Sequence, residues 1–164
     1  MEMNFNEIIK YANDELISKG NLSVVDEVFS PDYIVHSGGK DYQGHEFIIR
    51  FTNLLLAAVS DIQVVDVEIL LQAGEVVAWQ RTLTGKHIAN MMGALPSGQI
   101  LTWRDMVVSR FENGRIAEEW NVSELAGCQL AHVNVPSNFG KNVPPNFSNN
   151  VPPVFTHNVP PSKI

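Results

Sequence analysis

The chain has 164 residues, 45% of them hydrophobic and 18% charged, and its formal net charge at pH 7 is −7. This composition is typical of one globular domain with a buried core, and the acidic balance excludes the basic face that nucleic-acid binding needs. The longest apolar run without a charge, residues 51–60, is too short to span a bilayer, and the single Cys128 excludes an internal disulfide. The start of the chain has no signal-peptide pattern, so we expect a cytoplasmic protein without nucleic-acid or membrane partners.

Three helices are expected in the first third of the chain. Apolar residues recur at helical spacing over residues 5–17 and 45–59, and Asn21 or Ser23 would cap a short helix that runs through Phe29. Gly20 would end the first helix, and Pro31 would stop the second. A short strand at 33–36 and a loop at 38–44 are expected between the second and third helices.

Four long strands follow, joined mainly by short turns, among them the Asn-Gly hairpin turn ENGR (112–115). They are predicted at residues 62–71, 76–88, 99–111 and 116–123. Helices followed by a run of strands predict an α+β fold, with the helices packed on one face of a curved antiparallel sheet. Such a sheet would wrap the third helix into a cone whose open end forms an apolar pocket.

The composition changes near residue 133, which divides the chain into a domain (1–133) and a tail (134–164). All 18 acidic residues lie before this point. The tail repeats every eight residues, with valine or phenylalanine at every fourth position, and an extended chain would put them all on one face. Its prolines oppose sheet pairing. The tail is therefore either disordered or an arm that docks on a neighbouring subunit or a partner protein.

Three strings in the domain carry a family resemblance. They are FSPDYIVH (29–36), LTGKHIANMMGALPSGQILTW (83–103) and RFENGRIAEEWNVSELAGCQL (110–130). In this order the strings resemble the SnoaL-like polyketide cyclases of the nuclear-transport-factor-like cone superfamily, over about residues 5–131. The resemblance implies a cone-shaped α+β barrel and a cofactor-free enzyme. Its reaction would be intramolecular aldol addition on a polyketide-like or other β-dicarbonyl substrate. Glu124 stands where the family usually has aspartate.

Ring closure of this kind needs a base, hydrogen-bond donors for the oxyanion and a shaped apolar pocket. Glu124 is the first candidate for base or acid, because it occupies the family's carboxylate position; the alternative is a solvated glutamate at a strand end. His87, at a predicted strand end, would donate to an enolate or orient a carboxylate, or else cap the loop backbone. We predict that both face one cavity, whose apolar walls raise the carboxylate pKa.

Two further catalytic candidates are Asp105 and His36. Strand alternation puts Asp105 on the same face as Trp103, and Arg104 on the opposite face. Asp105 is then either a second carboxylate inside the cone or part of a salt bridge on the outer face. His36 either lines the pocket mouth or is a half-buried structural histidine.

Substrate contacts are expected from the strands and from the loop before residue 99. The candidates are Trp79, Met91, Met92, Trp103 and Asn121. The two methionines would pack over the pocket mouth or fill gaps in the core. Asn121 would offer an amide donor or lie at a strand edge. No metal-ligand spacing or cysteine pair is present, so we expect neither a metal nor another cofactor.

Other functions remain open from the residues alone. The cone could carry an isomerase, a dehydratase or an epoxide hydrolase, or it could be a non-catalytic small-molecule binding or assembly module. We expect a homodimer through the outer face of the sheet, because the strands carry apolar residues on both faces and the helices cover only one.

Overall fold

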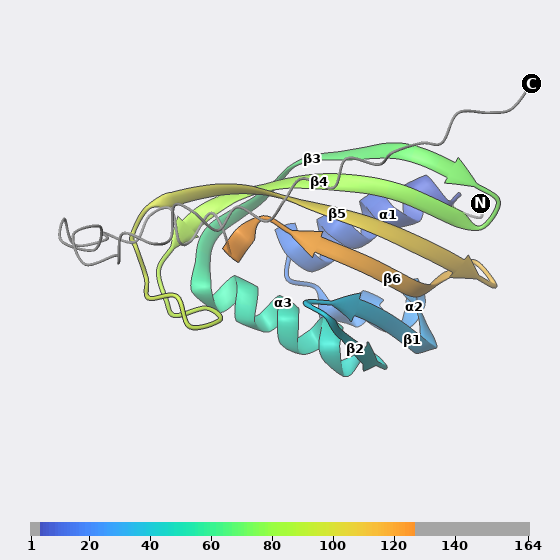
Figure 1. The fold of residues 1–164 in the computed structure, drawn as a ribbon, viewed down its shortest axis with the longest axis horizontal. Helices are drawn as coiled ribbons and strands as arrows, with labels where there is room; N and C mark the ends of the chain where they lie inside the picture. The colour runs from blue at the N-terminus through green and yellow to red at the C-terminus, as the bar shows by residue number, and fades with distance from the viewer. Residues whose placement is uncertain (1–3, 127–164) are drawn as a thin grey trace, which may run out of the picture. The chain divides into compact units, whose positions relative to one another are not determined.

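The computed structural model describes residues 4–126, in which α-helices lie against a six-stranded sheet (Figure 1). The helices are α1 (Phe5–Asn13), α2 (Val25–Val28) and α3 (Glu46–Ala58), with a π-helical turn at Asp14–Ser18 and a 3-10 turn at Leu22–Val24. The strands are β1 (Phe29–Ser37), β2 (Lys40–Gln43), β3 (Val59–Ala73), β4 (Val76–His87), β5 (Ile100–Glu112) and β6 (Arg115–Ser123). This arrangement confirms the predicted α+β fold class. The predicted tail and Cys128 lie outside the described residues.

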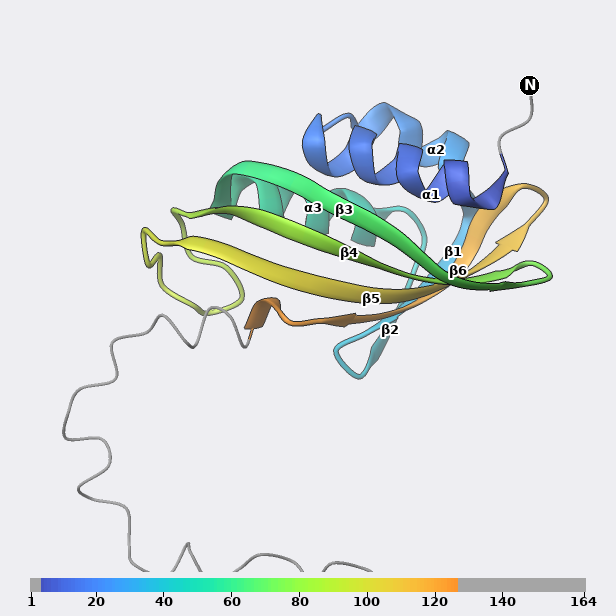
Figure 2. The same cartoon turned by 90° about the horizontal axis from the view of Figure 1, so that it is seen from above.

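The first helix begins at a capping box. The Asn4 side chain accepts a hydrogen bond from the Glu7 backbone N–H at 3.0 Å, and the Glu7 carboxylate accepts one from the Asn4 backbone N–H at 2.9 Å. This reciprocal pair satisfies two N–H groups that the helix itself cannot satisfy. The buried face of α1 then packs on the sheet, where Phe5 stacks on Phe111 with ring centroids 4.2 Å apart. Figure 2 shows α1 and α2 covering one face of the sheet.

The prediction of a loop at residues 38–44 is wrong, because the chain forms a β-hairpin there. β1 pairs with β2 from Ile34–Gln43 to Ser37–Lys40. Gly38 and Gly39 both have positive φ, at 60° and 75°, which a two-residue type I′ turn requires and glycine allows without strain. The Gly-Gly dipeptide was therefore the sequence signal for this turn.

The sheet has the order β2-β1-β6-β5-β4-β3, and one pair departs from the expected antiparallel arrangement. β1 runs parallel to β6, whereas the other neighbours are antiparallel. The expectation of a wholly antiparallel sheet is wrong at this pair. After the β1–β2 hairpin the chain passes through α3, and the meander from β3 to β6 then brings the last strand beside β1, running in the same direction.

The sheet bends around α3, as expected from the sequence. The β3–β4 register shifts at three places, and such bulges increase the local bend of a sheet. Gly85 of β4 packs closely against β3, and a Cβ at this position would overlap Cγ1 of Val59. Alternate β5 residues from Leu101 to Phe111 are buried on the concave side, so this side carries the core.

Candidate active site

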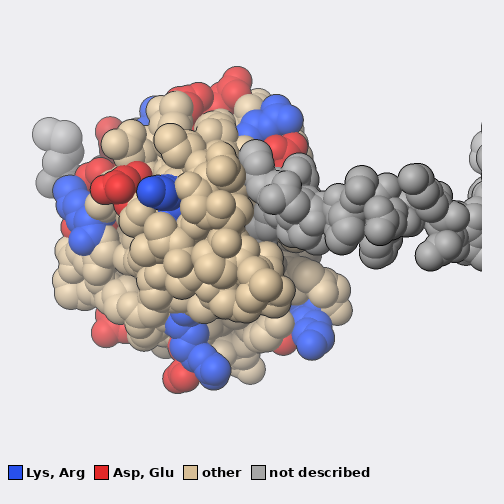
Figure 3. Space-filling model, turned by 90° about the vertical axis from the view of Figure 1, so that its left-hand side faces the viewer, with Lys and Arg blue, Asp and Glu red and all other residues tan. Residues whose placement is uncertain are grey.

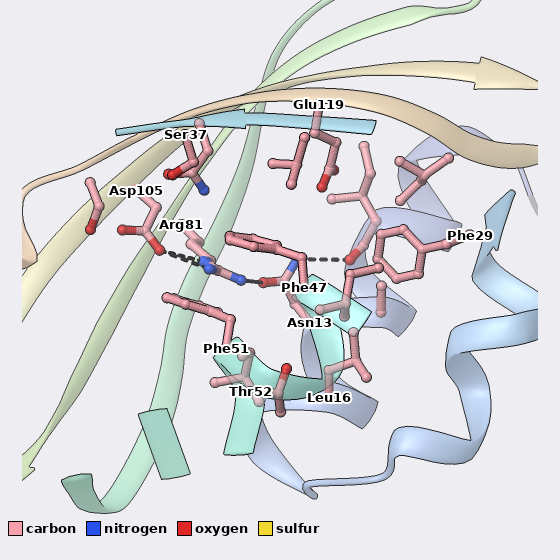
Figure 4. A pocket seen from close by; sticks show the side chains of 18 of the residues that line it. Asn13, Leu16, Phe29, Ser37, Phe47, Phe51, Thr52, Arg81, Asp105 and Glu119 are labelled. Carbon is pink, nitrogen blue, oxygen red and sulfur yellow. Dashed lines mark hydrogen bonds and ion pairs between the residues drawn. The ribbon is translucent and has the colours of Figure 1, made fainter. Parts of the chain in front are cut away.

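A cavity of about 160 Å³ lies between the helices and the concave face of the sheet (Figure 4). Most of its wall is apolar, with Ile9 from α1 and Phe47 and Phe51 from α3. The polar or hydroxyl-bearing side chains in the wall are Asn13, Tyr33, Ser37, Thr52, Arg81, Asp105, Glu119, Asn121 and Ser123. An apolar cavity with a few convergent polar groups is typical of a site for a small organic molecule.

Arg81 and Asp105 form an ion pair in the cavity wall. The two residues lie directly opposite each other on β4 and β5. Nε and Nη2 of Arg81 each lie 2.8 Å from the same oxygen, Oδ2 of Asp105. Asp105 is 2% exposed, and its other oxygen, Oδ1, is buried without a hydrogen-bond partner. Buried polar atoms are nearly always bonded, so this oxygen calls for an explanation.

Asn13 holds the guanidinium from the helix side. Arg81 Nη1 donates to Asn13 Oδ1 at 2.9 Å, and Asn13 Nδ2 donates to the Ile9 carbonyl oxygen, also at 2.9 Å. The chain turns π-helical directly after Asn13, at Asp14–Ser18, and single π-turns occur frequently at functional sites. Figure 4 shows the row Asp105–Arg81–Asn13 across the cavity. The arginine is therefore fixed on both sides, and it fixes one oxygen of Asp105.

Glu119 of β6 is a second carboxyl in the cavity wall, and its partners are hydroxyl groups. The Ser109 hydroxyl donates to Oε1 at 2.6 Å, and the Tyr33 hydroxyl donates to Oε2 at 2.7 Å. Trp79 Nε1 donates to the Ser109 oxygen at 2.8 Å. Burial raises the pKa of Glu119 above its usual value, although the hydrogen bonds from Ser109 and Tyr33 and the charge of Arg81 lower it. Burial also raises the pKa of Tyr33, with Glu119 contributing in the same direction.

Four of the sequence candidates line this cavity. They are Trp79, Met92, Asp105 and Asn121. Asp105 and Trp103 share the concave face, as strand alternation predicted, and Arg104 lies on the other face. Trp103 is 2% exposed and is part of the core rather than of the cavity lining.

Glu124 and His36 lie outside the cavity lining. Arg104 binds Glu124 in an exposed ion pair with Nη2 and Oε1 3.0 Å apart, and this hydrogen-bonded arginine lowers the pKa of Glu124. This direction is opposite to the expected one, because no apolar wall surrounds the carboxylate. His36 bonds to Glu118 at 2.9 Å and to Asp41 at 2.7 Å.

His87 and Met91 are buried beside the loop between β4 and β5 and do not line the cavity. The Ser97 backbone N–H donates to His87 Nδ1 at 3.4 Å, while His87 Nε2 is buried without a partner. The structure therefore does not bring His87 and Glu124 into one cavity. The next residue after Met91, Met92, has a φ of 51° and reaches the cavity wall.

The residues of the site that the sequence candidates missed include Asn13, Tyr33, Arg81 and Glu119. Strand alternation carried a signal for two of them, since Arg81 follows Trp79 by two positions and Glu119 precedes Asn121 by two. Asn13 and Tyr33 carried no comparable signal, because a lone polar residue on an apolar helix face or strand does not specify its partner.

Within residues 4–126, no group of three or more His, Cys, Asp or Glu side chains could hold a metal ion. In the same part of the chain, no helix is both long and apolar enough to cross a membrane.

Several solved structures share this fold. A proposed SnoaL-like polyketide cyclase from Jannaschia sp. CCS1 has 26% identity and a TM-score of 0.68, covering 79% of this chain and 92% of its own. IdmH, a proposed polyketide cyclase from Streptomyces antibioticus, has 24% identity and a TM-score of 0.62, covering 80% and 100%. AclR, a proposed hydroxylase from Streptomyces galilaeus, has 24% identity and a TM-score of 0.59, covering 72% and 87%. A search of curated proteins gave no match.

The bent sheet, the apolar cavity and its two carboxyls define an α+β cone protein with a small-molecule pocket. The family model of the SnoaL-like polyketide cyclases matches residues 7–130. The chain therefore belongs to the SnoaL-like polyketide cyclase family, as the resemblance in the sequence implied.

Proposed function

We propose that this protein is a cofactor-free cyclase that closes a ring in a polyketide-like or other β-dicarbonyl molecule, with Asp105 as the base. The observation that carries the proposal is the state of the Asp105 carboxylate. One oxygen is bound by Arg81, and the other is buried and unpartnered in the wall of an apolar cavity. Hydrogen-bond geometry at catalytic groups often tightens only when the substrate binds.

The first chemical step is proton transfer from carbon. Asp105 Oδ1 takes the proton from a carbon between two carbonyl groups, and the C–H electron pair forms an enolate. The enolate carbon then attacks a ketone of the same molecule, forming a C–C bond, while the C=O π pair moves to the ketone oxygen. Arg81 orients Asp105 throughout, because its guanidinium is itself anchored on Asn13. A fixed base of this kind is worth about 100-fold to 10,000-fold in rate.

The lining of the cavity supports an apolar substrate with carbonyl groups. Arg81 is the one cation in the lining of the described residues, and each of its three guanidinium nitrogens lies within 2.9 Å of an oxygen of Asp105 or Asn13. The loop between β4 and β5 also presents apolar side chains outward, with Ile88 48% and Leu95 74% exposed. Figure 3 shows that this end of the molecule is largely uncharged, with charged residues around its edge.

The test compares Asp105→Asn with Glu124→Gln as the matched control. The probe is an aryl β-keto ester that carries a ketone placed for six-membered ring closure. Two rates are measured by NMR in deuterated buffer: exchange of the acidic C–H for deuterium, and formation of the cyclic product. Asp105→Asn should lower both rates by about 100-fold or more, whereas Glu124→Gln should leave both unchanged.

Two results would overturn this assignment. Unchanged rates in a folded Asp105→Asn variant, with loss in Glu124→Gln, would return the catalytic role to the family's carboxylate position. Saturable binding of the probe by the wild type without exchange or closure would favour the small-molecule binding module.

We also propose that the outer face of the sheet forms a homodimer. Met106 and Val122 are paired on neighbouring strands and are 53% and 73% exposed, and Trp120 beside them is 42% exposed. Such a contiguous apolar face on paired strands is typical of an interface. Light scattering should give twice the monomer mass, and Val122→Asp should give a folded monomer. A monomeric wild type at micromolar concentration would contradict the dimer.

A further inference from the structure

Glu119 differs from Asp105 in the groups that surround its carboxyl. Asp105 has an arginine within ion-pair distance, whereas no cation of the described residues pairs with Glu119. Its two oxygens are bound by two hydroxyls, those of Ser109 and Tyr33. Both carboxyls nevertheless point into the same cavity, from neighbouring strands (Figure 4).

The hydrogen bonds to Glu119 determine where the hydrogen of an uncharged Glu119 can go. Trp79 Nε1 can only donate, so the Ser109 oxygen accepts from it, and the single Ser109 hydrogen goes to Oε1 of Glu119. The Tyr33 hydroxyl donates to Oε2. When Glu119 is protonated, its O–H hydrogen goes either to a ligand in the cavity or to the Tyr33 oxygen, whose own hydrogen then turns away.

We propose that Glu119 is the proton donor of the ring-closing step: its carboxylic acid hydrogen-bonds to the ketone oxygen under attack and gives that oxygen its proton. The inference rests on the proposed function, because it assigns the partner of Asp105 in the same reaction. Ser109 and Tyr33 are positioning residues, which hold the carboxyl so that the O–H hydrogen points into the cavity.

The step is balanced in protons and electrons. Asp105 gains the proton from carbon, and the new C–C bond uses the enolate electron pair. The ketone oxygen receives the C=O π pair and takes a proton from Glu119, which becomes a carboxylate. After product release Asp105 gives its proton to water and Glu119 takes one from water, so the net change is one proton moved from carbon to oxygen. Neither an oxidant nor a metal enters the step.

Burial in the cavity wall shifts the Glu119 carboxyl towards its uncharged form. Burial is the largest influence on its pKa and raises it, while Ser109 of β5, Tyr33 of β1 and Arg81 of β4 oppose the rise. In its uncharged form, a carboxylic acid can both donate a hydrogen bond and transfer its proton in the transition state.

The decisive experiment measures deuterium exchange and ring closure separately, on the same aryl β-keto ester. Glu119→Gln keeps the shape of the side chain but cannot transfer a proton. It should lower ring closure by about 100-fold and leave exchange within about threefold of wild type, because exchange depends on Asp105. Glu118→Gln, one position along β6 on the outer face, is the matched control and should change neither rate. In the wild type, closure should also fall as pH rises through the pKa of Glu119, and this fall should be absent from Glu119→Gln.

Each outcome is decisive for one proposal or the other. Unchanged closure in Glu119→Gln, or an equal loss of exchange and closure in a folded variant, overturns this inference alone. Absence of exchange with the wild type overturns the proposed function and this inference together. If Glu119→Gln does not fold, Tyr33→Phe replaces it: a shift of the pH limb of closure, with exchange retained, supports the inference, and an unshifted limb overturns it.

Discussion

Glu118 and Glu119 are adjacent in the chain and chemically identical, yet they lie on opposite faces of β6. Glu118 faces outward, where hydrogen bonds from His36 and Arg110 lower its pKa. Glu119 faces the cavity, where burial raises its pKa. The same side chain is therefore an ion-pair partner on one face and a candidate acid on the other. The difference shows that the face of the sheet, more than the residue type, decides the chemistry.

The two faces also differ in their ion pairs. On the concave face the side chains of Arg81 and Asp105 are 11% and 3% exposed, and Asn13 completes the arrangement. On the outer face Arg104 and Glu124 are 59% and 55% exposed. Solvent screens an exposed pair, whereas a buried charge that loses its partner is strongly unfavourable.

The largest expected effect comes from breaking the concave ion pair. Arg81→Met leaves Asp105 buried without its cation, so the free energy of unfolding at neutral pH should fall by about 3–5 kcal/mol. Arg104→Met is the matched control on the outer face and should leave it almost unchanged. Urea unfolding followed by circular dichroism measures both. Equal losses in the two variants would contradict the contrast between the faces.

The next effect concerns the space on the concave side of β4. Gly85→Ala would drive a methyl group into Val59 and to 3.1 Å from the Ser60 carbonyl oxygen. It should lower the free energy of unfolding by about 1–3 kcal/mol, because a packed strand pair cannot yield without backbone movement. Lys86→Ala, the next residue and exposed, should be nearly neutral. Thermal melts of the two variants test this prediction. A wild-type melting temperature for Gly85→Ala would contradict it, because it would show that the strand pair accommodates the added methyl group.

A smaller effect is the opposite pH dependence of the two glutamates. The lowered pKa of Glu118 means that its stabilisation is present above its unfolded pKa, near 4.5, and is lost as pH falls through the folded pKa. The raised pKa of Glu119 means that its contribution to stability is full below its unfolded pKa, also near 4.5. This contribution is lost as pH rises through the folded pKa. Urea unfolding of wild type, Glu118→Gln and Glu119→Gln from about pH 3 to about pH 8 should give difference curves of opposite slope. Parallel curves would be inconsistent with the two environments.

The smallest effect is at His36 on the outer face. Glu118 is the first cause of its raised pKa and Asp41 the second. Its stabilising contribution is therefore full below the unfolded value of 6.5 and is lost as pH rises through the folded pKa. NMR titration should give a His36 pKa above 6.5 in wild type and a lower one in Glu118→Gln. Titration of His36 at the same pH in both proteins would remove Glu118 as the cause.

Much of the fold follows from local patterns in the sequence. The predicted third helix, residues 45–59, matches α3 to within one residue at each end. The match is close because apolar residues at helical spacing run along the whole length of the helix. The β5–β6 hairpin was predicted from its Asn-Gly turn, which requires positive φ at both residues. The parallel contact of β1 with β6 was not predicted, because no local pattern records which distant strands become neighbours.

The candidate site, too, could be predicted from the sequence only in part. Asp105 was placed on the face of Trp103 by alternation along a single strand. Its pairing with Arg81 depends on the β4–β5 register, and the loop of residues 88–99 between the strands is too long to fix that register from the sequence. The importance of Glu124 rested on a family position, and the sequence alone did not show that Arg104 holds this carboxylate at the surface.

The sequence by itself determined that β6 is a strand with carboxylates at 118 and 119, but it did not determine which one faces the cavity. Alternation from the buried Ile116 would put Glu118 inside, whereas alternation from Asn121 puts Glu119 there. The register shift opposite Arg110 and Phe111 makes Ala117 an extra residue on β6, and this bulge reverses the alternation. Only the tertiary structure decided the outcome, because a bulge forms between two strands and depends on how both pack against the core.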